Sequence, residues 1–317
     1  MINNRFDVHQ HIITKPYLAA LERAGIKGTS GLHFPEWSEE LALDVMDRRG
    51  IQTAMISISS PGVYFGDEKA ASQLAHEVND TFRALVERHP DRFGALGHLP
   101  LPDVDAALLE LERLANELKL DGVILLSSIG GQYLGDVAFE EVFAELNRLS
   151  MVVFIHPTLL PSGPKLQLDL PEFMLEAPFD TTRAVANLVY SGTLERYPDI
   201  RFILAHAGGT VPFLEWRMSI AAEVDQRLED KLPHSASYYL RRFYFDTAMS
   251  PSRPALAALR EFVDPSHILF GSDWPMVPES IAKRTISDLE DLPFFDEHTK
   301  ELISCHNAKE LFVRFRS

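Results

Sequence analysis

Short apolar runs alternate with longer amphipathic segments along the whole chain. The short runs are rich in β-branched and aromatic residues and nearly continuous in hydrophobicity, which is typical of strands covered on both faces. We predict strands at residues 5–9, 53–59, 93–98, 122–126, 151–156, 201–206, 243–246 and 268–271. Between them, apolar positions three or four residues apart predict helices at residues 68–88, 103–118, 137–149 and 181–196.

Regular alternation of strands and helices predicts a parallel sheet in an α/β fold. Eight such units in roughly 270 residues fit a closed (β/α)8 TIM barrel better than an open doubly wound sheet. The residues after Pro278 predict additional C-terminal helices packed on the outside of the barrel. No linker rich in Gly or Ser divides the chain and no internal repeat is evident, so we expect residues 1–317 to form a single domain.

The segment 157–178 has several prolines and little periodicity, which predicts a long loop after the fifth strand. In barrels such loops cover active sites. Asp180 directly precedes Thr181, where the next helix is predicted to begin, and we expect it to cap that helix.

Composition narrows the class of protein. The chain is 46% hydrophobic and 10% aromatic, which indicates a folded globular protein. Its net charge of −16 argues against broad binding to nucleic acid or to an anionic membrane, and favours a small-molecule partner. A single cysteine, Cys305, excludes an intrachain disulfide and suits a reducing compartment. With neither a signal-peptide pattern nor an apolar run of membrane-spanning length, we expect a cytoplasmic protein.

Polar side chains stand at the ends of several predicted strands. His9 and His11 lie two residues apart, so both imidazoles point to the same side of a strand and can bind one metal ion. His156, His206 and Asp273 stand at or just beyond the fifth, sixth and eighth strands. Because barrel active sites lie at the C-terminal ends of the strands, these groups are predicted to face one opening.

The same segments resemble a known family. The His-x-His at 9–11, FIHP at 154–157, AHAGG at 205–209 and FGSDWP at 270–275 are similar to the amidohydrolase superfamily. The chain more closely resembles its aminocarboxymuconate-semialdehyde decarboxylase-related branch, called amidohydrolase 2. PFDTTRA at 178–184, SGTLERYPDIRFILAHAGG at 191–209 and YFDTA at 244–248 resemble the subgroup that decarboxylates 6-methylsalicylate and other ortho-hydroxybenzoates.

The resemblance implies one divalent metal ion with four protein ligands, which are His9, His11, His156 and Asp273. Three imidazoles and a carboxylate with one open position suit zinc best, and manganese is the alternative. The carboxylated lysine that bridges two metals elsewhere in the superfamily has no counterpart in GVILLSS at 122–128, which argues against a two-metal site.

The resemblance further assigns His206 as an acid or base beside the metal, and its alternative role is a fourth histidine ligand. Imidazole exchanges protons near neutral pH, and in related decarboxylases the proton donor is either this histidine or the metal-bound aspartate. Both His206 and Asp273 are therefore predicted catalytic residues. Asp246, at the end of the seventh strand, either orients one of the histidines or makes a structural hydrogen bond. Asp7 is a candidate for a residue that supports the metal ligands by hydrogen bonds without binding the metal itself.

Substrate contacts are predicted at three positions. Arg217 matches an arginine that in relatives reaches a substrate carboxylate, sometimes in a neighbouring subunit, and its alternative is a solvated helix residue. His33 and Trp37, with Phe34 between them, either line a pocket or pack in the core. The family's dicarboxylate-binding members carry a further arginine before the second strand, and GTSGLHFPEWS at 28–38 has none. This absence favours an aromatic monocarboxylate as the substrate.

The sequence therefore predicts a metal-dependent, non-oxidative decarboxylase of an ortho-hydroxybenzoate such as 6-methylsalicylate. The first alternative is a hydrolase, for example a lactonase or amidase, in which the same metal activates water. The second is a catalytically silent barrel that serves as a binding subunit. The family resemblance also implies a homodimer.

Overall fold

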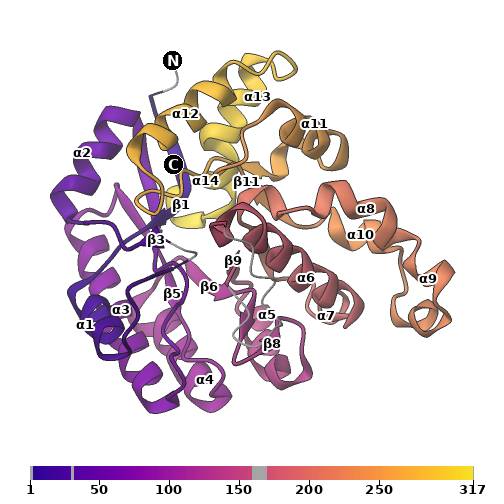
Figure 1. The fold of residues 1–317 in the computed structure, drawn as a ribbon, viewed down its shortest axis with the longest axis horizontal. Coiled ribbons are helices and arrows are strands. Elements are labelled where there is room, and N and C mark those ends of the chain that lie inside the picture. The colour runs from indigo at the N-terminus through magenta and orange to yellow at the C-terminus, as the bar shows by residue number, and fades with distance from the viewer. Residues whose placement is uncertain (1–2, 30–31, 159–169, 317) are drawn as a thin grey trace.

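The centre of the molecule is an eight-stranded parallel sheet surrounded by helices (Figure 1). The computed structural model describes residues 3–29, 32–158 and 170–316. Each strand pairs with the next one along the sheet in sequence order. The strands are β1 (Arg5–His11), β4 (Ile51–Ser57), β5 (Phe93–His98), β6 (Gly122–Leu126), β9 (Val152–His156), β10 (Arg201–Leu204), β11 (Tyr244–Asp246) and β12 (Ile268–Leu269).

Hydrogen bonds join the two edges of this sheet. The amide of Val8 in β1 donates to the carbonyl of Phe270 just beyond β12, at 2.9 Å. The amide of His11 donates to the carbonyl of Trp274 at 2.8 Å, and the amide of Asp273 donates to the carbonyl of His9 at 2.8 Å. The sheet is therefore a nearly closed TIM-type barrel, as predicted.

Helices cover the outside of the barrel, as the amphipathic pattern predicts. None of those in the described ranges is long and apolar enough to cross a bilayer. Short antiparallel ribbons, β2 (Gly28–Thr29) with β3 (Leu32–His33) and β7 (Ser128–Ile129) with β8 (Gln132–Tyr133), follow two of the strands. The helices are α1 (Lys15–Arg23), α2 (Glu39–Arg49), α3 (Glu68–Arg88), α4 (Val104–Arg113), α5 (Glu140–Arg148), α6 (Glu176–Tyr190), α7 (Thr193–Arg196), α8 (Val211–Ser219), α9 (Ala221–Val224), α10 (Ala236–Leu240), α11 (Arg253–Phe262), α12 (Glu279–Glu290), α13 (Glu297–Glu301) and α14 (Asn307–Leu311).

The helix predicted at 181–196 is wrong at its start. Helix α6 begins at Glu176, and Pro178 therefore falls in its first turn. A proline is tolerated there because backbone N–H groups of the first turn have no partner within the helix. It ends at Tyr190, and Gly192, with φ of 78°, separates it from α7. Asp180 is consequently inside α6 and does not cap it. Of the predicted loop 157–178, residues 159–169 lie outside the described ranges, and a short 3-10 turn, Glu172–Met174, precedes α6.

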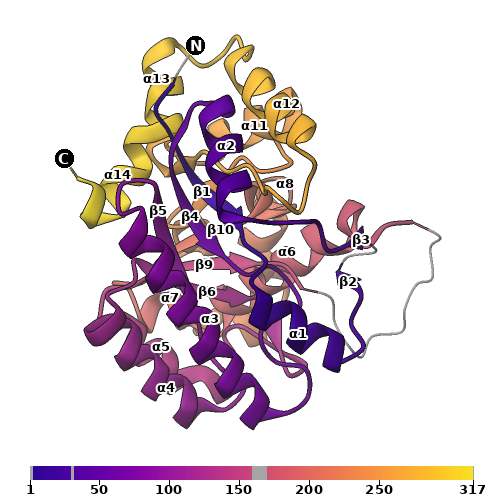
Figure 2. The ribbon, with the colours of Figure 1, turned by 90° about the vertical axis from the view of Figure 1, so that its left-hand side faces the viewer.

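The barrel interior is a separate apolar cluster formed by alternate residues of the strands. Phe6 and Val8 of β1 belong to it, as do Met55, Leu96, Ile124 and Phe154 from the neighbouring strands. The C-terminal helices, predicted to pack outside, do so in α12 and α13. Helix α14 differs, because its Ala308 and Leu311 and the following Phe312 join the interior cluster. Figure 2 shows α14 on the side of the strands opposite to β2 and β3.

Replacing Phe312 with Ala should test this closure. The side chain is 2% exposed and its ring stacks on Phe6 with centroids 5.8 Å apart, so its loss opens a cavity under the barrel. We expect the free energy of unfolding in urea to fall by about 3–5 kcal/mol. The neighbouring Val313 is 61% exposed, and Val313→Ala should change it by less than about 0.5 kcal/mol. Equal losses in the two variants would contradict the packing role of α14.

Candidate metal centre

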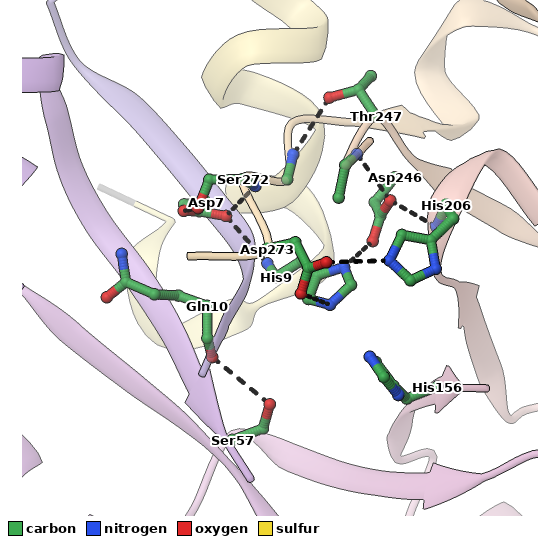
Figure 3. A network of polar contacts seen from close by, with 12 residues as sticks. Asp7, His9, Gln10, Ser57, His156, His206, Asp246, Thr247, Ser272 and Asp273 are labelled. Carbon is green, nitrogen blue, oxygen red and sulfur yellow. Dashed lines mark hydrogen bonds and ion pairs between the residues drawn. The ribbon is translucent and has the colours of Figure 1, made fainter. Parts of the chain in front are cut away.

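Four histidines and one aspartate converge at the C-terminal mouth of the barrel. Figure 3 shows His9, His156, His206 and Asp273 of this group. His9 and His11 come from β1 and His156 ends β9, whereas His206 and Asp273 follow β10 and β12. The Nε2 atoms of His9 and His11 are 3.0 Å apart and lie 3.3 and 3.4 Å from Asp273 Oδ1. The Nε2 atom of His206 lies 3.3 Å from Asp273 Oδ2. Ligand atoms of His9, His156, His206 and Asp273 all fall within 4.8 Å of one another.

Irregular backbone brings these side chains together. A register shift in β1 between Asp7 and Gln10 lets Val8 and His9, although adjacent, both contribute to the inside of the barrel, whereas the Gln10 side chain points away (Figure 3). His206 and Asp273 adopt left-handed backbone conformations, with φ of 55° and 60°. Such conformations are uncommon for residues other than glycine and cluster at functional sites.

One glycine makes room for the cluster. A Cβ atom on Gly271 would lie 3.0 Å from the Cβ of His9 and 3.1 Å from the Cγ of Asp246. Any side chain at this position would therefore press on the residues that build the centre. This close approach accounts for the glycine in the FGSDWP segment.

In the three buried histidines of the cluster, the ring nitrogen that faces away from the centre has a hydrogen-bond partner. His9 Nδ1 lies 2.6 Å from Asp246 Oδ2, and His156 Nδ1 lies 2.8 Å from the carbonyl oxygen of Pro157. Because these partners are acceptors, the proton is on Nδ1 and the Nε2 lone pair faces the centre. His11 Nδ1 lies 3.0 Å from Ser57 Oγ, which holds the third ring in the same orientation. Metal-binding histidines in proteins are oriented in this way.

The buried carboxylates of this centre call for positive charge. Asp273 Oδ1 is buried and has no hydrogen-bond partner among the described residues. Burial alone would lower the pKa of His9, but the carboxylates of Asp246 and Asp273 outweigh it and raise that pKa to about 10. Burial lowers the pKa of His11 to about 4, so this ring stays neutral. A divalent cation at the convergence point would satisfy both the lone pairs and the carboxylate, so the donor set fits a metal ion.

Two carboxylates behind the cluster hold it in place. Asp246 binds His9 through Oδ2, while its Oδ1 accepts hydrogen bonds from the amides of His206 and Ala248 at 2.8 and 2.9 Å. Asp246 therefore orients one ring directly and reaches His206 only through the backbone. Asp7 Oδ1 accepts from the amides of His9 and Ser272, both at 3.0 Å, and its Oδ2 accepts from the Ser272 hydroxyl at 2.5 Å. Asp7 thus links β1 to the segment that carries Asp273.

Asp180 has a structural role near the same mouth. It accepts hydrogen bonds from the hydroxyls of Ser127 and Tyr133 and from the amide of Thr158. Because Thr158 lies two residues after His156, Asp180 fixes the chain just beyond that histidine. Its position in the interior of α6 could not be inferred while the helix was predicted to begin after it.

Within the described ranges, none of the three residues predicted to contact the substrate forms a hydrogen bond with the cluster. Arg217 is exposed on α8 and makes no hydrogen bond or ion pair within the described ranges. His33 is exposed on β3. Trp37 is half-buried against the outer core, and its Nε1 has no partner in the part of the chain that the structure covers. Their role in substrate binding stays a prediction.

His98 is a functional candidate that the sequence pattern did not single out. It ends β5 and points into the barrel, because it lies two residues from Leu96 of the interior cluster. Burial lowers its pKa to about 3, with His11 adding to the effect. The signal that could have found it is the one used for His156, a polar residue at the end of a buried strand.

Comparison with known proteins identifies the family. A model described as "Amidohydrolase" matches residues 6–314. The 6-methylsalicylic acid decarboxylase of Penicillium expansum is 36% identical, over 98% of this chain and 97% of its own. A crystal structure named Amidohydrorolase II superimposes with a TM-score of 0.92 at 27% identity, covering 98% of this chain and 100% of the other.

A third similar structure was solved with a bound metal ion. The 5-carboxyvanillate decarboxylase of Novosphingobium aromaticivorans, solved with manganese and 4-hydroxy-3-methoxy-5-nitrobenzoic acid, superimposes with a TM-score of 0.86 at 22% identity, over 98% of this chain and 96% of its own. The chain belongs to the amidohydrolase family. It is a decarboxylase of that superfamily, related to enzymes that act on aromatic hydroxy acids.

Replacing Asp246 with Asn should weaken the centre without unfolding the barrel. The amide keeps one acceptor for the His206 and Ala248 amides but loses the charge that orients His9. We expect metal affinity to fall about 10–100-fold, measured by competition with a chelating dye. Asp291→Asn, an exposed substitution after α12, should leave it unchanged. Unaltered affinity in Asp246→Asn would remove Asp246 from the supporting layer.

Proposed function

We propose that this protein catalyses the metal-dependent, non-oxidative decarboxylation of an ortho-hydroxybenzoate, with 6-methylsalicylate as the best candidate. The observation that carries the proposal is the convergence of Nε2 lone pairs and the Asp273 carboxylate on one buried point. The 36% identity to a 6-methylsalicylic acid decarboxylase over nearly the whole chain supports this substrate over others.

In this proposal His9, His11, His156 and Asp273 hold the metal. Three imidazoles and a carboxylate favour zinc, while the manganese in the 5-carboxyvanillate decarboxylase supports manganese as the alternative. His206 then remains free beside the ligands. The short distances within the set His9, His156, His206 and Asp273 support the other assignment, in which His206 replaces His11 as a ligand.

The chemistry needs charge compensation and a proton. When bound, the metal would compensate the negative charge of the substrate's carboxylate and ortho oxygen and fix their orientation. His206 is partly exposed at the mouth, and in this proposal its Nε2, 3.3 Å from Asp273 Oδ2, delivers the proton. The proton passes to the ring carbon that bears the carboxylate, the C–C bond then breaks, CO₂ leaves, and its bonding electron pair restores the ring. Asp273, 3.3 Å from His206, is the alternative donor.

We also propose that two copies of the chain associate through the surface around α8. Phe213 and Trp216 are 85% and 70% exposed on this helix, and Val224 after it is 79% exposed. Exposed apolar side chains gathered in this way mark association surfaces. Arg217 lies on the same helix, so an association here would bring it near the partner chain and not into its own barrel mouth.

Carbon dioxide release tests the reaction. Metal-loaded protein should release CO₂ from 6-methylsalicylate, measured manometrically or by a coupled bicarbonate assay. His206→Asn should keep its metal and lose about 10²–10⁴-fold in turnover, because the proton donor is gone. His298→Asn, at an exposed position on α13, is the matched control and should remain active. Silence of the metal-loaded protein toward every ortho-hydroxybenzoate, with turnover of lactones or amides instead, would replace the proposal with hydrolysis.

Metal content separates the two ligand assignments. If His11 is a ligand and His206 is not, His11→Ala should lose stoichiometric metal after dialysis while His206→Ala retains it. The metal is counted by inductively coupled plasma mass spectrometry. The opposite result would make His206 a ligand and remove it as the free proton donor. Loss in neither variant would contradict a metal at this centre.

A further inference from the structure

A cavity of about 590 Å³ lies among the loops at the mouth of the barrel. Most of its wall comes from residues in or after β4, β5 and β6, and the rest from Ala24 and Ile26 after α1 and Thr158 after β9. Its volume falls in the range of roughly 300–1,000 Å³ that is usual for small-molecule sites. Two connections place it next to the ligands. Ser57, which holds the ring of His11, is followed by Ile58, which contacts His98 in the cavity wall, and Thr158 in the wall lies two residues after His156.

The described wall is mostly apolar, and it carries no lysine, arginine, aspartate or glutamate. Val63, Leu99 and Leu101 are almost completely buried in it, and Leu126 is partly exposed. Leu126 approaches the loop after β4 closely, because a Cβ on Gly62 would lie 2.8 Å from its Cδ1. A wall of this kind would leave a second carboxylate of a ligand without a partner, whereas it would accept a hydrocarbon group.

His98 supplies a directed hydrogen-bond donor in this wall. The amide of Ile58 donates to His98 Nε2 at 3.1 Å, so Nε2 carries a lone pair and the proton of the neutral ring is on Nδ1. The residue is 3% exposed, and its Nδ1 has no hydrogen-bond partner in the described ranges. The hydroxyl of Ser128, also in the wall, is a buried polar atom without a partner in the described ranges. A buried polar group without a partner is rare in folded proteins, and a bound ligand is one way to satisfy it.

The backbone of His98 is held from behind by an amide side chain. Asn79 of α3 is fully buried, accepts from the amide of His98 at 2.9 Å, and donates to its carbonyl oxygen at 2.9 Å. Asn79 also donates to Glu110 at 2.6 Å, and Arg113 in turn binds Glu110. The donor therefore has a fixed position before any ligand arrives, which is the arrangement expected of a binding group.

We propose that this cavity binds the aromatic ring of the substrate and selects it, with His98 Nδ1–H donating a hydrogen bond to a substrate oxygen and the apolar wall accepting an uncharged substituent ortho to the carboxylate. The proposal rests on the proposed function, because it takes the metal centre as the site of the reacting carboxylate. It makes His98 and Leu126 determinants of specificity, and it identifies the substrate class as monocarboxylic ortho-hydroxybenzoates with a small apolar group.

Three acids that differ only in this substituent test the wall. They are salicylate, 6-methylsalicylate and 3-hydroxyphthalate, which carry hydrogen, methyl and carboxylate at the same position. The wild type should prefer 6-methylsalicylate to salicylate by about tenfold or more in kcat/KM, and should act on 3-hydroxyphthalate least. Leu126→Asn should bring the methyl-to-hydrogen ratio close to one. Leu109→Asn, at a position on α4 that is 70% exposed, should leave the ratio unchanged.

Binding tests the donor independently of turnover. In a His206→Asn background, His98→Phe should weaken binding of 6-methylsalicylate about 10–100-fold by titration calorimetry. His98→Asn, which carries an amide nitrogen near the position of Nδ1, should recover most of the loss. His298→Phe is the matched control at an exposed histidine. Metal content and melting temperature of each variant identify any that fail to fold.

The outcomes separate the two proposals. Suppose that the wild type turns over these acids. An unaltered methyl-to-hydrogen ratio of kcat/KM in Leu126→Asn, or unaltered binding in His98→Phe, would then overturn the cavity assignment and leave decarboxylation standing. Equal weakening in folded His98→Phe and His98→Asn would overturn the donor role. Neither turnover nor binding of any of the three acids by the metal-loaded wild type would overturn the proposed function and the cavity assignment together.

Discussion

The demand for positive charge at the barrel mouth is the constraint on which the rest of the site depends. The Nε2 atoms of His9 and His11 and the Oδ1 atom of Asp273 lie 3.0–3.4 Å from one another, and the carboxylates of Asp246 and Asp273 raise the pKa of His9 to about 10. The surrounding groups keep this arrangement in place. Asp246, Ser57 and the Pro157 carbonyl set the ring orientations, and Asp7 ties the two segments that carry the ligands.

The net negative charge of the chain affects how an anionic substrate can be bound at this centre. A protein with a net charge of −16 repels an anionic substrate at long range, and the described wall of the cavity offers no lysine or arginine to offset that repulsion. Attraction for a carboxylate must therefore be local. A cation held by neutral histidines and one aspartate would provide it at the point of the proposed reaction, and the mostly apolar wall with its donor at His98 would complement it at the ring.

The sequence pattern was sufficient for the barrel, because buried parallel strands are nearly continuous apolar runs that stand out between amphipathic helices. Polar residues at the ends of those runs, His156 and Asp273 among them, were found for the same reason. The start of α6 was missed because a proline in the first turn resembles a loop residue. His98 also ends a buried strand, but its orientation depends on the Ile58 amide and the Asn79 side chain, which come from other elements and cannot be read from the residues around it.

The packing of α14 has a consequence for how the protein is made. The first strand carries two of the proposed metal ligands, yet its Phe6 end rests on Phe312 and Phe315, which are synthesised nearly a whole chain later. While the chain is being synthesised, β1 at first has neither its β12 neighbour nor the helix beneath it, so these native contacts of long sequence separation form only after residues 307–315 have been made. The geometry of the proposed metal ligands on β1 therefore depends on residues about 300 positions away in the sequence.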